Sequence, residues 1–130
     1  MQVYPFTFIG NNDISWTLTE SRKSLDVYGI NGGGIIFRPQ GSIKAENIEG
    51  GISSFSVDLL MAFTGGNPTD RKVELWINDV FIESYTLSTK KVETFTVNNL
   101  DVDGVFKLEL KATASNTRQI TVNNLTWISK

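Results

Sequence analysis

Apolar and polar residues alternate with a period of two along most of the chain. The alternation is clear at Ile14, Trp16 and Leu18, and it recurs in residues 55–59, 73–77, 106–110 and 120–122. A period of two puts successive side chains on opposite faces of a β-strand, so each run predicts a strand with one face toward a core. The best helical window, residues 45–48, is short and runs into Gly50 and Gly51. We therefore expect an all-β protein.

Turn-forming residues separate the alternating runs. Glycine, asparagine, aspartate and proline gather at residues 10–13, 32–34, 50–51, 65–68, 78–79 and 103–104. Their spacing predicts roughly nine to eleven antiparallel strands, many joined by hairpins, as in a sandwich or a barrel. With 130 residues, of which 40% are hydrophobic, the chain is expected to form one domain over residues 1–130, without a linker.

Two local features qualify this strand pattern. The apolar phase of the last run shifts after Val122, so we expect a β-bulge at Asn123-Asn124. The segment Thr-Val-Asn-Asn-Leu occurs at residues 96–100 and again at 121–125. A third copy is missing, so we interpret the two copies as strand ends with similar exits rather than as a repeat architecture.

Composition excludes several functional classes. The sequence has no histidine and no cysteine, which rules out Ser-His-Asp hydrolases, thiol chemistry and thiolate metal sites. Its net charge of -2 lacks the basic excess that nucleic acid binding requires, so no nucleic acid partner is expected. The longest apolar run, residues 59–63, is far too short to insert in a membrane.

The first ten residues do not resemble a signal peptide, because no lysine or arginine precedes an apolar stretch. We expect a mature fragment, a module with an added methionine, or a part exported by another route.

Catalysis without histidine would most simply use two carboxylates, as in a glycosidase. Asp58 and Glu74 are the best candidates for such a pair. Each falls where the alternation predicts a solvated strand face, so an exposed strand carboxylate is the favoured interpretation. We therefore expect a protein without chemistry of its own. The sequence Asp101-Val102-Asp103-Gly104 begins like a calcium loop but lacks the later ligands, and a hairpin turn explains it.

Trp76 is the aromatic residue that departs from the core pattern. It lies on the face opposite Val73, Leu75 and Ile77, so its indole is either covered by neighbours or offered to a ligand. An aromatic ring stacks on the C–H face of a sugar, while planar polar groups bind the hydroxyls. Trp16 and Trp127 share the core phase, and Tyr28 and Tyr85 are left open. A saccharide-binding patch is predicted around Trp76, with Arg38, Asp58, Glu74, Arg71 and Asn78.

Several segments resemble a known group of modules. They are residues 12–16, 34–38, 48–59, 62–67, 73–78, 94–100 and 120–127. Together they are similar to the carbohydrate-binding β-sandwich (jelly-roll) modules appended to secreted bacterial nucleases and polysaccharide-active proteins. They are also similar to the carbohydrate-binding insertions of evolved bacteriophage distal tail proteins. The resemblance spans nearly the whole chain.

The resemblance implies an antiparallel β-sandwich of jelly-roll type that binds a cell-surface or wall polysaccharide, extracellularly, as part of a larger secreted protein or a virion. It carries over Arg38, Asn67, Arg71 and Trp76 as ligand-binding residues. It requires no cofactor, although such modules often hold a structural calcium ion. The alternative function is a structural or protein-docking spacer without glycan binding. The residues suspected as calcium ligands are Asn11, Asn12, Asp13 and Asn123.

Overall fold

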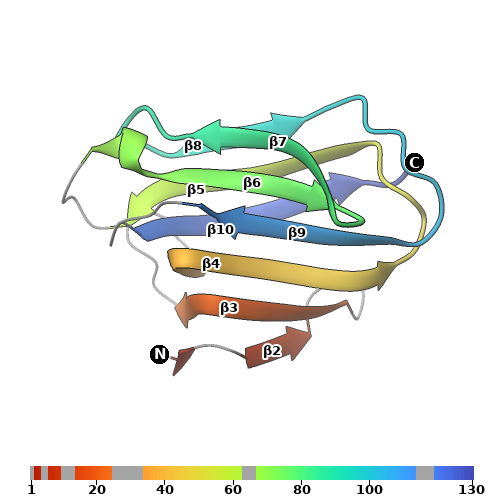
Figure 1. Ribbon diagram of the computed structural model, residues 1–130, viewed down its shortest axis with the longest axis horizontal. Coiled ribbons are helices and arrows are strands. Elements are labelled where there is room, and N and C mark those ends of the chain that lie inside the picture. The colour runs from red at the N-terminus through yellow and green to blue at the C-terminus, as the bar shows by residue number, and fades with distance from the viewer. Residues whose placement is uncertain (1, 4–5, 10–13, 25–33, 63–66, 114–118) are drawn as a thin grey trace.

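The computed structural model describes residues 2–3, 6–9, 14–24, 34–62, 67–113 and 119–130 (Figure 1). Within them, strands dominate and a single short 3-10 helix, η2, spans Pro68–Asp70. No helix in these ranges is long and apolar enough to cross a membrane. The strands are β1 (Gln2–Val3), β2 (Phe6–Ile9), β3 (Ser15–Ser24), β4 (Gly34–Ile48), β5 (Ser54–Ala62), β6 (Lys72–Ile77), β7 (Val80–Thr86), β8 (Glu93–Val97), β9 (Phe106–Ala112) and β10 (Gln119–Ile128).

The strands form two layers that share β4. The hydrogen-bonded order is β7-β6-β9-β4-β10-β5-β8, with β3 on the other edge of β4, and every pairing in it is antiparallel. The second half of β4 pairs with β9, whereas its first half pairs with β10. Strands β8, β5 and β10 therefore lie behind β7, β6 and β9 in Figure 1. The predicted antiparallel β-sandwich is confirmed.

A bend in β4 lets one strand serve both layers. Phe37 pairs with Ser21 and Ser42 pairs with Thr19, so four residues of β4 lie opposite the single residue Glu20. Gly41 is buried in this corner, where an added Cβ atom would lie 2.8 Å from the carbonyl oxygens of Arg38 and Glu20. A residue without a side chain is needed there because the two backbones approach so closely.

The core fills the space between the layers, as the alternation predicted. Leu75, Leu108 and Leu110 point inward from the front layer, and Val57 and Leu59 point inward from the back layer; none of them is solvent-exposed. Burial of apolar side chains from both layers provides the main stabilising free energy of such a sandwich. The two layers therefore share a single core.

The two tryptophans assigned to the core are structural. Trp16 is 6% exposed, and its ring lies 6.0 Å from that of the half-buried Trp127, which also contacts Phe106 at 6.4 Å. Trp127 reaches the core because the predicted bulge exists: the register of β10 against β5 shifts between Asn123 and Thr126. The bulge turns the residues after it to the opposite face.

The two Thr-Val-Asn-Asn-Leu segments adopt related conformations at different places. The second asparagine of each copy is left-handed, with φ of 61° at Asn99 and 51° at Asn124. The first copy leaves its strand after Val97, as predicted, but the second copy stays inside β10 and forms the bulge. The prediction of two strand ends was therefore wrong for the second copy. A left-handed asparagine can end a strand or interrupt it, and only the neighbouring strands decide which.

Candidate functional site

Trp76 lies on the outer surface of the front layer. We call this surface, formed by β6, β9 and β4, the front face. Across it the register pairs Trp76 with Glu109 of β9, and Glu109 with Lys44 of β4. Two residues further along each strand, on the same face, Glu74 pairs with Lys111. Charged side chains of β6 and β9 therefore lie next to the indole, and Lys44 of β4 lies beyond Glu109.

The indole of Trp76 is half-buried and has specific partners. Its Nε1–H donates to Oε1 of Glu74 at 3.0 Å. The ammonium of Lys111 lies over the ring, 4.4 Å from its centroid, and the ring of Phe81 meets Trp76 edge to face at 5.8 Å. Phe81 itself is 48% exposed. The ring is thus held in one orientation at the surface, between an apolar neighbour and charged ones.

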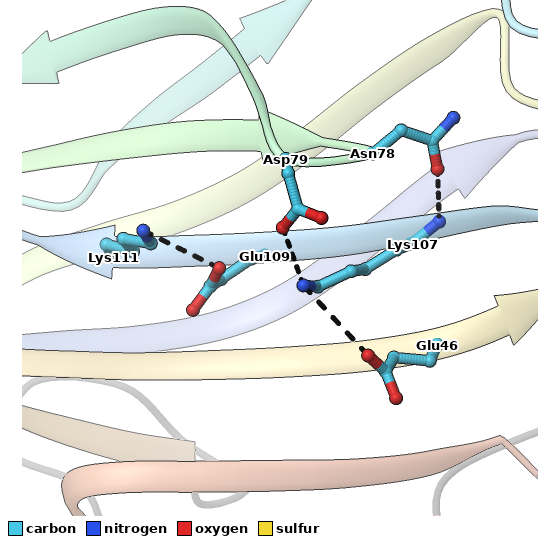
Figure 2. Close-up of polar contacts among 6 residues, drawn as sticks. All are labelled: Glu46, Asn78, Asp79, Lys107, Glu109 and Lys111. Carbon is cyan, nitrogen blue, oxygen red and sulfur yellow. Dashed lines mark hydrogen bonds and ion pairs between the residues drawn. The ribbon is translucent and has the colours of Figure 1, made fainter.

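Ion pairs organise the rest of the front face (Figure 2). Lys111 pairs with Glu109 at 3.7 Å, and Lys107 pairs with Asp79 at 2.6 Å and with Glu46 at 3.9 Å. The hydrogen bond from Lys107 lowers the pKa of the Asp79 carboxyl, and the same bond raises the pKa of the lysine. Acidic and basic groups on this face thus largely neutralise one another.

A shallow, open depression of about 320 Å³ lies at one end of this face. Asn78 closes one side of it: its Oδ1 accepts a hydrogen bond from the backbone N–H of Lys107 at 2.9 Å. Asn78 and Asp79 both have positive φ, 52° and 64°, and form the predicted two-residue turn between β6 and β7. The depression is lined by Glu46, Asn47, Asn78, Val105, Phe106 and Lys107.

The sequence prediction grouped residues that the structure separates. Glu74 and Asn78 lie on β6 and at its end, on the same side of the molecule as Trp76. Arg38 is exposed in the bent part of β4, a strand that pairs with β9 and not with β6. Asp58 lies on β5, in the back layer. The predicted patch is therefore reduced to Trp76 and its neighbours on β6.

Arg71 requires a correction. It is 1% exposed, and its guanidinium donates to the carbonyl oxygens of Gln119 at 2.7 Å and of Asn67 at 3.0 Å. The alternation that places Trp76 outward places Arg71 inward, with Val73. Arg71 therefore joins η2 to the start of β10 and is not part of a surface patch. Asn67 is exposed, and its N–H donates to Asp70 at the start of η2.

The predicted carboxylate pair does not converge. Glu74 faces outward from the front layer, and Asp58 faces outward from the back layer, with the shared core between them. Asp58 accepts hydrogen bonds from the hydroxyl of Thr94 at 2.7 Å and from the Asn124 amide at 2.9 Å. Two carboxylates on opposite surfaces cannot act on one glycosidic bond.

The residues considered for calcium are engaged elsewhere or lie outside the described ranges. Asp101 and Asp103 both form ion pairs with Lys130. The predicted hairpin turn was wrong here: the segment connects β8 to β9, which do not pair with each other, and Val102 bridges to Ile52 instead. Asn123 accepts a hydrogen bond from the N–H of Asn124 at 2.8 Å. In the described residues, no three carboxylates come together as a metal site. Residues 11–13 and Tyr28 are not among those described.

Tyr85, which the sequence left open, has a structural position. Its ring stacks on Phe95 with centroids 5.4 Å apart, and its hydroxyl donates to Glu93 at 2.8 Å.

Two residues beside Trp76, Lys111 and Glu109, were not predicted as site residues. Lys107, Glu109 and Lys111 show the polar phase of a strand, but sequence alone does not reveal that β9 lies next to β6.

Comparisons with known proteins bear on the fold. No protein-family profile matches the chain, and no curated protein matches its sequence. Solved structures do match. A family 36 carbohydrate-binding module in complex with calcium and xylotriose is 17% identical, with a TM-score of 0.64, over 85% of this chain and 89% of that chain. A family 61 module with β-1,4-galactotriose is 10% identical, with a TM-score of 0.61 and 88% coverage of both chains.

A family 35 module from Paenibacillus barcinonensis is 18% identical, with a TM-score of 0.57, over 88% of this chain and 93% of that chain. In each case the match extends over most of both chains, although sequence identity is low. The resemblance noted in the sequence is thereby confirmed at the level of architecture. The chain has the β-sandwich fold of carbohydrate-binding modules.

Proposed function

We propose that this chain is a non-catalytic carbohydrate-binding module whose binding surface is the front face around Trp76. The observation that carries the proposal is the half-buried indole on the outer surface of this fold, held by Glu74, Phe81 and Lys111. An indole fixed at a surface offers a flat apolar area to a sugar ring, and nearby carboxylates and ammonium groups can bind its hydroxyls.

The proposed ligand is a polysaccharide of a cell surface or wall. A site built around one indole provides little contact area, so its affinity for a single chain is modest. Several copies on a larger assembly would raise the avidity without new contacts. We therefore propose that the module acts outside the cell, attached to a secreted protein or to a virion such as a phage tail.

The absence of catalysis is part of the proposal. The two carboxylates that the sequence offered as a pair, Asp58 and Glu74, lie on opposite surfaces. The Glu74 carboxylate accepts the N–H of the neighbouring indole. A carboxylate engaged in this way is placed to orient the ring rather than to transfer a proton to a bound sugar.

A structural or protein-docking spacer is the second candidate. One observation favours it: Trp76 already has a partner at its N–H and another over its ring. In that case the indole stabilises the layer, and replacing it would lower the stability of the module rather than remove an activity.

Binding of a fluorescent fusion to bacterial cells and to purified wall polysaccharides separates the two functions. We expect saturable labelling that Trp76→Ala removes while the melting temperature stays near that of the wild type. Thr96→Ala, an exposed change on the back layer, is the matched control and keeps the labelling. Parallel assays with calcium and with a chelator test for a metal requirement. Failure of a folded wild-type module to label any surface would favour the spacer.

A further inference from the structure

We propose that the ring face of Trp76 that Lys111 covers is a cation subsite, and that the glycan bound there carries protonated amino groups. This inference rests on the proposed function and specifies its ligand class. Lys111 would then occupy, in the free protein, the place that an ammonium group of an amino sugar takes in the complex.

The contacts around the ammonium of Lys111 are those of a cation site. Its Nζ lies 4.4 Å from the centroid of the Trp76 ring and 3.7 Å from Oε1 of Glu109. Positive charge over an aromatic face is attracted by the negative potential of the ring, most strongly for tryptophan. A carboxylate beside it adds a direct ionic partner. Figure 2 shows Lys111 and Glu109 together on β9.

Glu74 supplies a second carboxylate next to the ring. It accepts the indole N–H at 3.0 Å, and the register places it opposite Lys111. A carboxylate that accepts the N–H increases the electron density of the indole and so strengthens its attraction for a cation. Trp76 thus lies between two negatively charged groups, Glu74 on its own strand and Glu109 on the neighbouring strand.

Lys111 can leave this place easily. Its side chain is 38% exposed, whereas that of Glu109 is 17% exposed. An ion pair of this kind at a surface contributes little to stability, and a long lysine side chain gains rotamer freedom in water. When Lys111 swings into solvent, the ring and two carboxylates stay behind in place. Such a site attracts an external ammonium and repels a sugar carboxylate.

The other lysines of the front face lie away from the ring that Lys111 covers. Lys72 is on the same face of β6 but four residues before Trp76. Lys107 is already paired with Asp79 and Glu46. Lys44 lies opposite Glu109 in the register, on the far side from Trp76. The half-exposed ring of Phe81 borders the subsite on the side of β7 and offers an apolar contact for the C–H face of the same sugar.

Calorimetric titration of the whole module with three oligosaccharides of equal length tests the inference. The probes are a glucosamine hexamer, an N-acetylglucosamine hexamer and cellohexaose, at pH 6, where the free amines are charged. We expect the glucosamine hexamer to bind at least about tenfold more tightly than either neutral probe. Glu109→Gln should weaken that binding several-fold, and by a larger factor than it weakens binding of the neutral probes.

Lys111→Ala provides the discriminating variant, with Lys44→Ala as its matched control. Both remove one positive charge from the front face, but only Lys111 lies over the ring. We expect Lys111→Ala to strengthen glucosamine binding several-fold, because the Lys111 ammonium no longer competes for the ring. Any gain in affinity in Lys44→Ala should be smaller. These two changes are at exposed or half-exposed strand positions, so they keep the fold intact.

Three results would overturn the cation subsite. The first is a glucosamine hexamer that binds no more tightly than a neutral hexamer. If Trp76→Ala then lost binding of the neutral hexamer, the proposed function would still stand. The second is an equal change of glucosamine affinity in Lys111→Ala and Lys44→Ala, because overall charge, and not the position of Lys111 over the ring, would then explain it. The third is a failure of both the wild type and Lys111→Ala to bind any of the three hexamers. The labelling of wall polysaccharides by the fluorescent fusion tests the proposed function separately.

Discussion

The outer surfaces of the two layers are built from the same alternation but differ in the side chains they present. The front face carries an indole and long charged side chains that pair at distances up to 3.9 Å. The outer surface of the back layer, which we call the back face, carries short hydroxyl and amide groups. Thr94 and Asn124 both donate to Asp58, and Ser56 contacts Thr96 at 3.4 Å.

This difference shows what period-two patterning can and cannot identify. Alternation marks residues that point away from the core, and it does so equally well for Asp58 and for Trp76. It does not say which outward residues are neighbours. On the back face the carboxylate of Asp58 is held by two donors at short distance, whereas on the front face long side chains can exchange partners. Exchangeable partners favour the front face as the binding surface.

The largest expected effect is on the core that the two faces share. Arg71→Leu removes a buried guanidinium and leaves the carbonyl oxygens of Gln119 and Asn67 without this donor. Buried acceptors that lose their partner destabilise a protein, here by about 3 kcal/mol for a charged donor with two such bonds. Urea unfolding monitored by tryptophan fluorescence would measure the loss.

Arg38→Leu is the control for Arg71→Leu, because Arg38 is exposed where Arg71 is buried. We expect it to lower the free energy of unfolding much less. If Arg71→Leu retained wild-type stability but lost glycan labelling, the surface role that the sequence suggested for Arg71 would be correct and its structural role wrong.

The second effect should appear in binding and not in stability. Trp76→Ala removes the flat ring from the front face, and the loss of a central aromatic anchor typically costs about 2 kcal/mol of binding free energy. Titration with the polysaccharide that labels best should show an affinity lower by about thirtyfold. A fall in melting temperature with unchanged affinity would instead make the indole a structural element of β6.

Much of the fold could be predicted from the sequence, because it depends on local pattern. The strands around Leu75 and Leu108, the turn at Asn78 and the bulge before Trp127 each have a short-range signal. The site could be predicted less well. Trp76 was identified from its phase, but the position of Lys111 over its ring depends on which strand lies next to β6.

Arg71 illustrates the same limit at the level of burial. A charged residue in a turn region is usually exposed, so composition favoured a surface position. The structure instead buries it among backbone carbonyl groups contributed by Asn67 and by Gln119, 48 residues away in sequence. Sequence spacing does not encode that approach, because it results from the packing of the two layers.

A third effect concerns the junction of the layers, where Tyr85 of β7 and Glu93 of β8 meet. Burial raises the pKa of Glu93, but hydrogen bonds from the backbone of Ser88 and Thr89, and from Tyr85, outweigh it and lower the pKa below its ordinary value. The unfolded chain then binds a proton at higher pH than the folded one. The stabilisation is therefore present above the ordinary glutamate pKa and is lost as the pH falls through the lower, folded value.

Thermal unfolding between pH 7 and pH 2.5 would measure this dependence, with Glu93→Gln as the comparison. We expect the wild type to lose more stability than the variant across the acidic range, because glutamine does not take up the proton. The carboxylate accepts from the hydroxyls of Tyr85, Ser88 and Thr89 as well as from two backbone N–H groups, so Glu93→Gln should also be less stable at neutral pH. Parallel pH curves would contradict the assignment.

The smallest effect is expected on the back face itself. Asp58→Ala removes the acceptor for Thr94 and for Asn124 at a half-buried position, so the free energy of unfolding should fall by about 1 kcal/mol. Glycan labelling should not change, because Thr94 and Asn124, the hydrogen-bond partners of Asp58, both lie in the back layer, behind the core. Labelling lost to the extent seen in Trp76→Ala, with the module still folded, would assign the binding surface to the back face. The contrast between the two faces would then be reversed. Short hydroxyl and amide groups in fixed positions would recognise the sugar, and the ring with exchangeable charged neighbours would not.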